Sequence, residues 1–169
     1  MEDDDPMEDM FSMTIENGGT LDVDTGTHLI IPNGMRATNN TGGTININGT
    51  VTNLSTIDNN GIINNNSGNT LINRGTLING GTINNASNGR ITNRGTIENI
   101  YGTINNNNGG KFESVQTISQ MGGVIYGEVE LISPSDDENK LGCNSGYGMI
   151  ALLLAGLAGF GLTRKFRKA

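Results

Sequence analysis

Apolar residues between positions 51 and 111 recur at a fixed spacing, separated by short polar stretches. Residues 51–70, VTNLSTIDNNGIINNNSGNT, align without gaps on residues 71–90, LINRGTLINGGTINNASNGR, so the chain repeats every 20 residues. The next copy, residues 91–111, carries one extra residue near Ile100 and Tyr101. A repeat of this length indicates a solenoid in which each copy forms one rung.

Within one copy the aliphatic residues are spaced by 6, 6 and 8 positions, as Val51, Ile57, Ile63 and Leu71 show. These segments are too short for helices and are punctuated by glycines, so each rung is predicted to hold three short strands joined by tight corners. We therefore predict an all-β fold, a parallel β-helix with rungs of about 20 residues, over residues 11–131 in five or six rungs.

Three columns of inward-facing side chains follow from stacking the copies. The predicted columns are Ile31, Val51, Leu71, Ile91 and Phe112; Ile57, Leu77, Ile97 and Ile118; and Ile63, Ile83, Ile104 and Ile125 or its neighbour Val124. The rungs before residue 51 keep the alternation but lose the register, and Ala37 stands where the column of Ile57 calls for an aliphatic residue.

Asparagine falls into columns of its own. The predicted columns are Asn33, Asn53, Asn73 and Asn93; Asn39, Asn59, Asn79 and Asn99; and Asn65, Asn85 and Asn106. Stacked amides at strand spacing can hydrogen-bond from one rung to the next, and asparagine tolerates the left-handed backbone that corners require. The columns therefore favour a packed solenoid over drift in a low-complexity tract.

Composition and charge narrow the class of protein. Only 34% of the chain is hydrophobic, which would suggest disorder if the apolar residues did not recur so regularly. The net charge is −7, and outside the last six residues 6 basic residues face 17 acidic ones. Nucleic acid is excluded as an expected partner, because an acidic body lacks the basic surface that releases counterions.

Beyond the repeat, the sequence is that of a polar spacer followed by a membrane anchor. Residues 132–145 are polar, and residues 146–162 run for 17 positions without a charge, which as a helix would span about 26 Å, near the lower limit for a bilayer. The segment 146–169 is thus predicted to be a transmembrane helix with a basic tail, although a helix docked on the solenoid is an alternative. The basic residues of the membrane stop, which place the solenoid outside, are Arg164, Lys165, Arg167 and Lys168.

The ending GCNSGYGMIALLLAGLAGFGLTRKFRKA resembles the tripartite C-terminal sorting domains of bacterial exported proteins, and most of all the Synergistetes-type group with its Gly-Cys-Asn motif. The resemblance implies that Gly142, Cys143 and Asn144 are read by a sorting protease or transpeptidase, whereas the simpler alternative is a plain thiol beside the membrane. The acidic segment 1–10 lacks the apolar region of a signal peptide, so we expect the natural start to lie upstream.

The repeated pattern NxGTIxN resembles the Asn/Gly-rich β-helical segments of bacterial surface proteins and autotransporter-like passengers. That resemblance implies a right-handed winding and a role as a stalk, an adhesive surface or a cell-envelope filament. The spacing itself does not fix the handedness.

Residues that could carry catalysis are sparse. Asp58 and Glu98 fall in one column, but they are two rungs, or about 10 Å, apart, and no basic residue is fixed between them. Asp22 and Asp24 could bind a cation weakly or act as exposed solubilising acids. His28 has no partner with which to form a nucleophilic or metal site.

Two stacked basic pairs could contact an anionic glycan. Arg74 lies one rung from Arg94, and Arg90 lies one rung from Lys111, although ordinary solvated edge charges are the simpler explanation of both pairs. We expect no cofactor and no metal.

The sequence as a whole predicts a non-catalytic structural or adhesin-like protein of the cell envelope, with the membrane as a partner and a surface glycan or further copies of the chain as further candidates. Two alternatives stay open. The chain could be the C-terminal stalk and anchor of a larger surface protein, or a polysaccharide-active β-helix.

Overall fold

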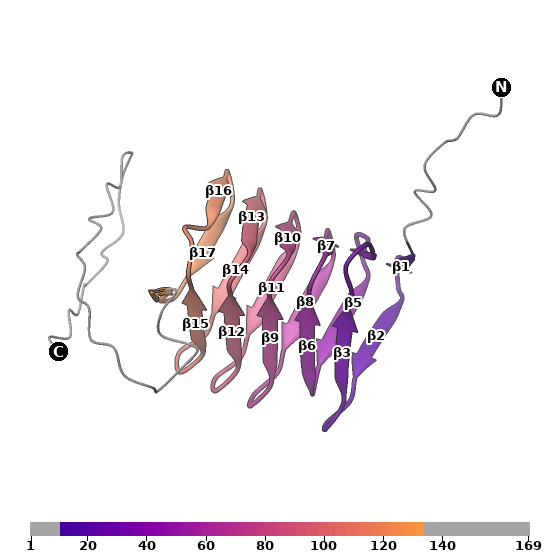
Figure 1. Ribbon diagram of the computed structural model, residues 1–169, viewed down its shortest axis with the longest axis horizontal. Helices are drawn as coiled ribbons and strands as arrows, with labels where there is room; N and C mark the ends of the chain where they lie inside the picture. Colours follow the sequence, from indigo (N-terminus) through magenta and orange to yellow (C-terminus); the bar gives the residue numbers. More distant parts are fainter. Residues whose placement is uncertain (1–10, 134–169) are drawn as a thin grey trace, which may run out of the picture. The chain divides into compact units, whose positions relative to one another are not determined.

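The computed structural model describes residues 11–133, which form a parallel β-solenoid of six rungs with no helix in that range (Figure 1). Each rung gives one strand to each of three sheets, and every strand pairs in parallel with its counterparts in the neighbouring rungs. The predicted all-β fold, the three strands per rung and the repeat of about 20 residues are confirmed.

The strands follow one another in the order sheet A, sheet B, sheet C, rung after rung. Sheet A holds β1 (Ser12–Ile15), β4 (Arg36–Asn39), β7 (Thr56–Asn59), β10 (Thr76–Asn79), β13 (Thr96–Ile100) and β16 (Ser119–Met121). Sheet B holds β2 (Thr20–Val23), β5 (Thr44–Ile47), β8 (Ile62–Asn65), β11 (Thr82–Asn85), β14 (Thr103–Asn106) and β17 (Val124–Tyr126). Sheet C holds β3 (His28–Ile31), β6 (Thr50–Asn53), β9 (Thr70–Asn73), β12 (Arg90–Asn93), β15 (Lys111–Ser114) and β18 (Glu130–Leu131).

The core is a stack of aliphatic side chains that point into the solenoid from all three sheets. Side chains alternate between the two faces of a strand, so each four-residue strand contributes two inward positions, and in most rungs these hold one aliphatic residue and one asparagine. Leu77, for example, is buried between Ile57 and Ile97 of the neighbouring rungs. Burying such a side chain contributes roughly 1.5–3 kcal/mol, and here that contribution is repeated at each rung.

The prediction for the first rung of sheet C was wrong by two residues. Leu29, and not Ile31, pairs with Val51, while Ile31 pairs with Asn53 in the column that was assigned to Asn33. The reason is that the corners between β3 and β4 and between β4 and β5 each hold two residues more than in the next rung, while the corner between β5 and β6 holds two fewer, so that paired residues are 22 positions apart here rather than 20. The position of Ala37 opposite Ile57 is confirmed.

Several predicted segments lie outside the described residues. These are the acidic segment 1–10, the linker beyond residue 133, and the apolar span with its basic tail, residues 146–169. Between residues 11 and 133, no helix is long and apolar enough to span a membrane.

Candidate functional site

Three ladders of buried asparagine run along the inside of the solenoid, one at the end of each strand column. In each ladder the side-chain Nδ2 of one rung donates to the side-chain oxygen of the next at 2.7–2.9 Å. The ladders are Asn39, Asn59, Asn79 and Asn99; Asn53, Asn73, Asn93 and Ser114; and Asn65, Asn85 and Asn106. The predicted columns are confirmed, except that Asn33 is not a member.

All the inner ladders point their N–H donors toward the C-terminal end. The last donors reach backbone oxygens, Asn99 Nδ2 that of Val124 at 3.1 Å and Asn106 Nδ2 that of Glu128 at 2.6 Å. At the other end the Oδ1 atoms of Asn39 and Asn65 have no hydrogen-bond donor, because apolar residues occupy these positions in the preceding rung. An orphaned buried acceptor costs about 1–3 kcal/mol, so these two ladders are fully satisfied only at their C-terminal ends. The third ladder is satisfied at both ends, because Asn53 Oδ1 accepts from the Ser55 N–H at 3.1 Å and Ser114 Oγ donates to the Gln116 carbonyl oxygen.

A further ladder runs along the outer face of sheet B with the opposite polarity. Each Nδ2 donates toward the N-terminal end at 2.8–2.9 Å, through Asn105, Asn84, Asn64 and Asn46 to Asp22. The carboxylate of Asp22 only accepts hydrogen bonds, so it ends the ladder without an unsatisfied donor. This bond also engages Asp22, and Asp24 lies beyond the end of β2, so the two acids do not lie on one strand. Within residues 11–133, no group of three or more metal-ligating side chains occurs.

The column of Asp58 and Glu98 is confirmed, with Ile78 between the two acids. Arg36 Nη2 lies 2.5 Å from Asp58 Oδ2, so this carboxylate is engaged in an ion pair that the sequence analysis did not identify. Because the rung that carries Ile78 lies between the two acids, their carboxylates are not placed to share a proton.

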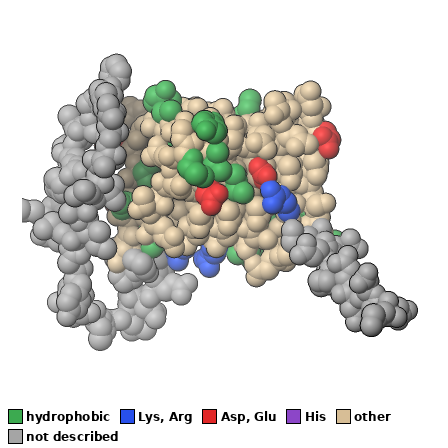
Figure 2. Space-filling view, turned by 90° about the horizontal axis from the view of Figure 1, so that it is seen from above, with side chains coloured by type: hydrophobic (Ala, Val, Ile, Leu, Met, Phe, Trp, Pro, Cys, Tyr) green, Lys and Arg blue, Asp and Glu red, His purple; other side chains and the backbone are tan. Residues whose placement is uncertain are grey.

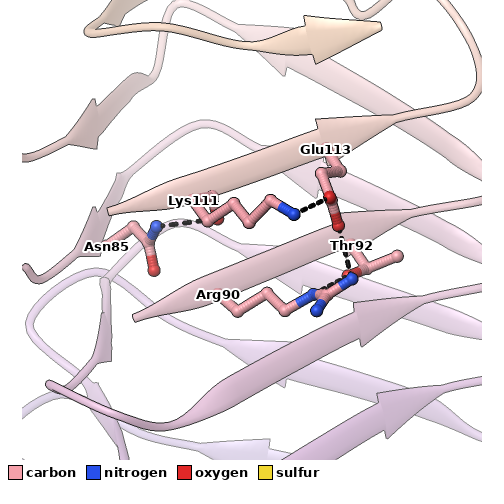
Figure 3. Close-up of polar contacts among 5 residues, drawn as sticks. All are labelled: Asn85, Arg90, Thr92, Lys111 and Glu113. Carbon is pink, nitrogen blue, oxygen red and sulfur yellow. Dashed lines mark hydrogen bonds and ion pairs between the residues drawn. The ribbon is translucent and has the colours of Figure 1, made fainter. Parts of the chain in front are cut away.

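The predicted stacking of Arg90 and Lys111 is confirmed, but a third residue joins them (Figure 3). Glu113, whose side chain is only 7% exposed, accepts from Arg90 Nη2 at 2.6 Å and pairs through its other oxygen with Lys111 Nζ. Arg90 Nε also donates to Thr92 Oγ1 at 3.2 Å. The two cations are thus bridged by one carboxylate rather than left open to an anionic ligand. Glu113 lies two positions after Lys111 on one face of β15, which is the signal that could have found it.

The protonation of Glu113 reflects two opposed effects. Burial raises the pKa of this carboxyl, but the hydrogen bonds and positive charges of Lys111 and Arg90 together outweigh it, and the pKa is lowered below the ordinary value. The carboxylate is therefore ionised and holds two rungs of sheet C together.

The other polar candidates are in ordinary surroundings. His28 Nε2 forms a hydrogen bond with Thr52 Oγ1 at 2.8 Å, across from the first rung to the second. Arg74 and Arg94 lie at equivalent corners one rung apart, where their backbone N–H groups donate to Asn53 and Asn73. His28, Arg74 and Arg94 are therefore parts of the solenoid wall and are not brought together into a reactive centre.

The corner at Tyr101 holds the inserted residue that interrupts the 20-residue repeat. The corresponding corner of the preceding rung is Gly80–Gly81, whereas here an inserted residue leaves Tyr101 with a φ of 56°, in the left-handed region that side chains rarely adopt. Such a conformation costs on the order of 1–3 kcal/mol in a residue other than glycine. The Tyr101 side chain is nevertheless 83% exposed, and its backbone N–H donates to the Met121 carbonyl oxygen at 3.0 Å.

Other apolar side chains are exposed beside this corner in the last rung. Met121 is 50% exposed and Tyr126 60% exposed, and Val124 is also exposed. We call Tyr101, Met121, Val124 and Tyr126 the Tyr101 surface. Figure 2 shows hydrophobic side chains gathered on the face where A strands turn into B strands, within a surface that carries few charges. The sequence located the inserted residue but gave it no role.

Two hollows lie among other residues of the described solenoid. A cavity of about 10 Å³ among the aliphatic side chains of the first rungs is too small for a ligand. An open hollow of about 240 Å³ lies at the first B–C corner, next to Asp22, Thr27 and His28. Its acid is already bonded to Asn46, which leaves little for a ligand to bind.

The predicted sorting motif, Gly142, Cys143 and Asn144, lies outside the described residues, as does the predicted membrane stop. The residues of that stop are Arg164, Lys165, Arg167 and Lys168. Searches against protein families, curated proteins and solved structures found no match to this chain.

Proposed function

We propose that this chain is a non-catalytic structural or adhesin-like protein of a bacterial-type cell envelope, in which the solenoid is displayed outside the membrane. The observation that supports the proposal is the continuity of the hydrogen-bonded ladders on the inner and outer sides of sheet B. Side chains on the outer face of this sheet are thereby held in a fixed row that repeats at each rung. Rows of this kind suit a stalk or an adhesive surface.

Rigidity follows from how the rungs are joined. A solenoid rung contacts only its neighbours, so bending is resisted only by the bonds between adjacent rungs. Besides its backbone pairs, each central rung here has inner amide bonds to the next rung, such as Asn59 to Asn79 and Asn73 to Asn93. At about 0.5–1.5 kcal/mol each, these bonds add to the aliphatic stacking and oppose fraying between rungs.

Attachment to the envelope is the second part of the proposal, and its support is the order of segments in the sequence. The uncharged run 146–162 acts as a membrane span, and the basic tail stops it on the cytoplasmic side. Gly142, Cys143 and Asn144 form the processing motif, as the resemblance to sorting domains suggests. We further propose a right-handed winding, which is the usual hand for parallel strands that are joined by a crossover.

The test is to express the chain in a bacterial host with a signal peptide supplied, and to follow it by fractionation and intact mass. Retention in the membrane at full mass supports a permanent anchor, and loss of the residues after Cys143 supports a sorting signal. A Cys143→Ala variant separates the two, since it abolishes processing and leaves a simple anchor intact. A full-length product that is released, or a solenoid protected from external protease in intact cells, would contradict the proposal.

A further inference from the structure

The Tyr101 surface combines an exposed aromatic ring with a strained backbone at a corner between sheets A and B. Elsewhere the corner between sheets A and B is built from small or polar residues, as at Asn60–Gly61 and Gly80–Gly81. At Tyr101 an inserted residue displays an aromatic ring at the surface in a strained backbone conformation. Strained residues persist where the surrounding structure enforces them, and they concentrate at ligand-binding positions.

The next rung is shaped to accommodate this ring. Gly122 lies against it, and a β-carbon added at Gly122 would be 2.7 Å from Cδ1 and Cε1 of Tyr101, so any larger residue would displace the ring. Tyr126 follows four residues later, so its Cα is no more than about 14 Å from that of Gly122. The two tyrosines therefore flank a strip that a short oligomer can cover.

Hydrogen-bonding groups adjoin the apolar strip. Tyr126 continues the outer column of Asn84 and Asn105, in which each amide uses one of its two N–H groups to bind the preceding rung. The second N–H of each amide is left for an external acceptor. Successive rungs are about 4.8 Å apart, which is comparable with the length of one pyranose unit.

Charge selects among the ligands that such a strip could take. The strands β13, β14, β16 and β17 and the corners between them carry no Lys or Arg. The charged residue next to Ile100 and Tyr101 is Glu98, and Glu128 follows β17. An anionic ligand would therefore be repelled, and the stacked cations Arg90 and Lys111 are bridged by Glu113 on another sheet.

From these observations we propose that the Tyr101 surface is a binding site for a neutral glycan chain. The apolar C–H face of a pyranose ring packs on Tyr101 and Tyr126, and the hydroxyl rim binds the outer amides of Asn105 and Asn84. This inference rests on the proposed display function, because such a glycan is met outside the cell. The binding itself is measured on purified protein and does not depend on how the chain is anchored.

The experiment is a calorimetric titration of the purified full chain with soluble β-1,4-linked oligomers of glucose and of N-acetylglucosamine, and with α-1,4-linked oligogalacturonate. We expect saturable binding of at least one neutral oligomer and weaker binding of galacturonate. Tyr101→Asn should lower the affinity by about tenfold or more without lowering the melting temperature, because asparagine suits the positive φ. Tyr126→Asn should lower the affinity similarly, because it removes the second aromatic ring, and the fold should tolerate it because asparagine continues the outer amide column.

Ile62→Thr is the matched control, because Ile62 is also an exposed apolar residue of sheet B but pairs with Thr44 and Thr82 away from the site. Its affinity should stay within twofold of the wild type. Preference for galacturonate, or equal affinities in wild type and Tyr101→Asn, would overturn the proposal. So would the absence of binding to both neutral oligomers at millimolar concentration. If the chain then self-associates through Tyr101, as seen by light scattering, the surface is an interface between copies instead.

Discussion

The Glu113 carboxylate lies 2.6 Å from the guanidinium of Arg90, a residue 23 positions earlier in the chain, and the two are brought together by the stacking of one rung on the next. Its other oxygen is paired with Lys111. A single buried acid thus joins two basic residues that would otherwise repel each other at strand spacing. The stability of this part of sheet C depends on that acid being present and ionised.

Replacing Glu113 with Gln should destabilise the solenoid by about 1 kcal/mol, a modest value because Arg90 and Lys111 are about half exposed and screened by solvent. The loss arises from the two cations left facing each other. Thermal melting at low and high salt checks this, since added salt should narrow the gap between variant and wild type. Thr92→Val, beside Glu113 in the same cluster, serves as the control and should show no such salt dependence, because it removes no charge.

The pH dependence has a defined sign. Because the pKa of Glu113 is lowered in the folded state, its contribution is fully present above the pKa of an unfolded glutamate, about 4.3, and is lost as the pH falls through the lower folded value. Melting temperature should therefore drop less steeply in Glu113→Gln than in the wild type as the pH is lowered below about 4.3. Parallel profiles for the two proteins would contradict the assigned ion pairs.

Leu77 is the sharpest test of the core, since it is fully buried between Ile57 and Ile97. Leu77→Ala should reduce the free energy of unfolding by about 2–5 kcal/mol through the cavity it leaves. Leu77→Asp should unfold the rod, because the charge would be buried without a partner. Circular dichroism and melting report both, and Ile78→Thr on the outer side of β10 should stay within about 0.5 kcal/mol of the wild type.

The direction of the hydrogen bonds in the inner ladders predicts that the same Asn→Ala substitution lowers the stability by different amounts at different positions in a ladder. Asn79→Ala leaves Asn99 Oδ1 without its donor and Asn59 Nδ2 without its side-chain acceptor. Among side-chain atoms, Asn39→Ala leaves only Asn59 Oδ1 without its donor, and it removes an acceptor that had no donor. The first variant should therefore be less stable than the second by about 1–3 kcal/mol in chemical denaturation. Equal losses would mean that packing, rather than hydrogen bonding, accounts for the ladder.

The repeat and the core could be predicted from sequence because each rung obeys the same steric rule as its neighbour. Ile63, Ile83 and Ile104 must share a column if the strands are in register, and one inserted residue shifts that register by one position. The rule fails where corners change length. Ile31 falls opposite Asn53 because the corners between β3 and β6 hold in total two residues more than those between β6 and β9, and nothing in the downstream spacing reports this difference.

The side-chain contacts were less accessible to sequence analysis. Arg36 and Asp58 are 22 residues apart and Arg90 and Glu113 are 23 apart, so both pairs emerge only after the rungs are stacked in the correct register. The stacked position of Arg90 and Lys111 was predicted, but the acid between them was not. The exposure of Tyr101 likewise depends on the path of an irregular corner, which the regular part of the repeat does not specify.

Tyr101 also allows the strain at this corner to be measured separately from any binding. Tyr101→Asn should raise the free energy of unfolding by about 1 kcal/mol, because the left-handed conformation is easier for asparagine and little buried contact is lost. Asn88, with a φ of 62°, is the internal comparison, since Asn88→Gly should change stability by only a few tenths of a kcal/mol. Chemical denaturation of both variants measures the difference. A destabilised Tyr101→Asn would show that the ring, packed on Gly122, stabilises the fold by more than the backbone strain costs.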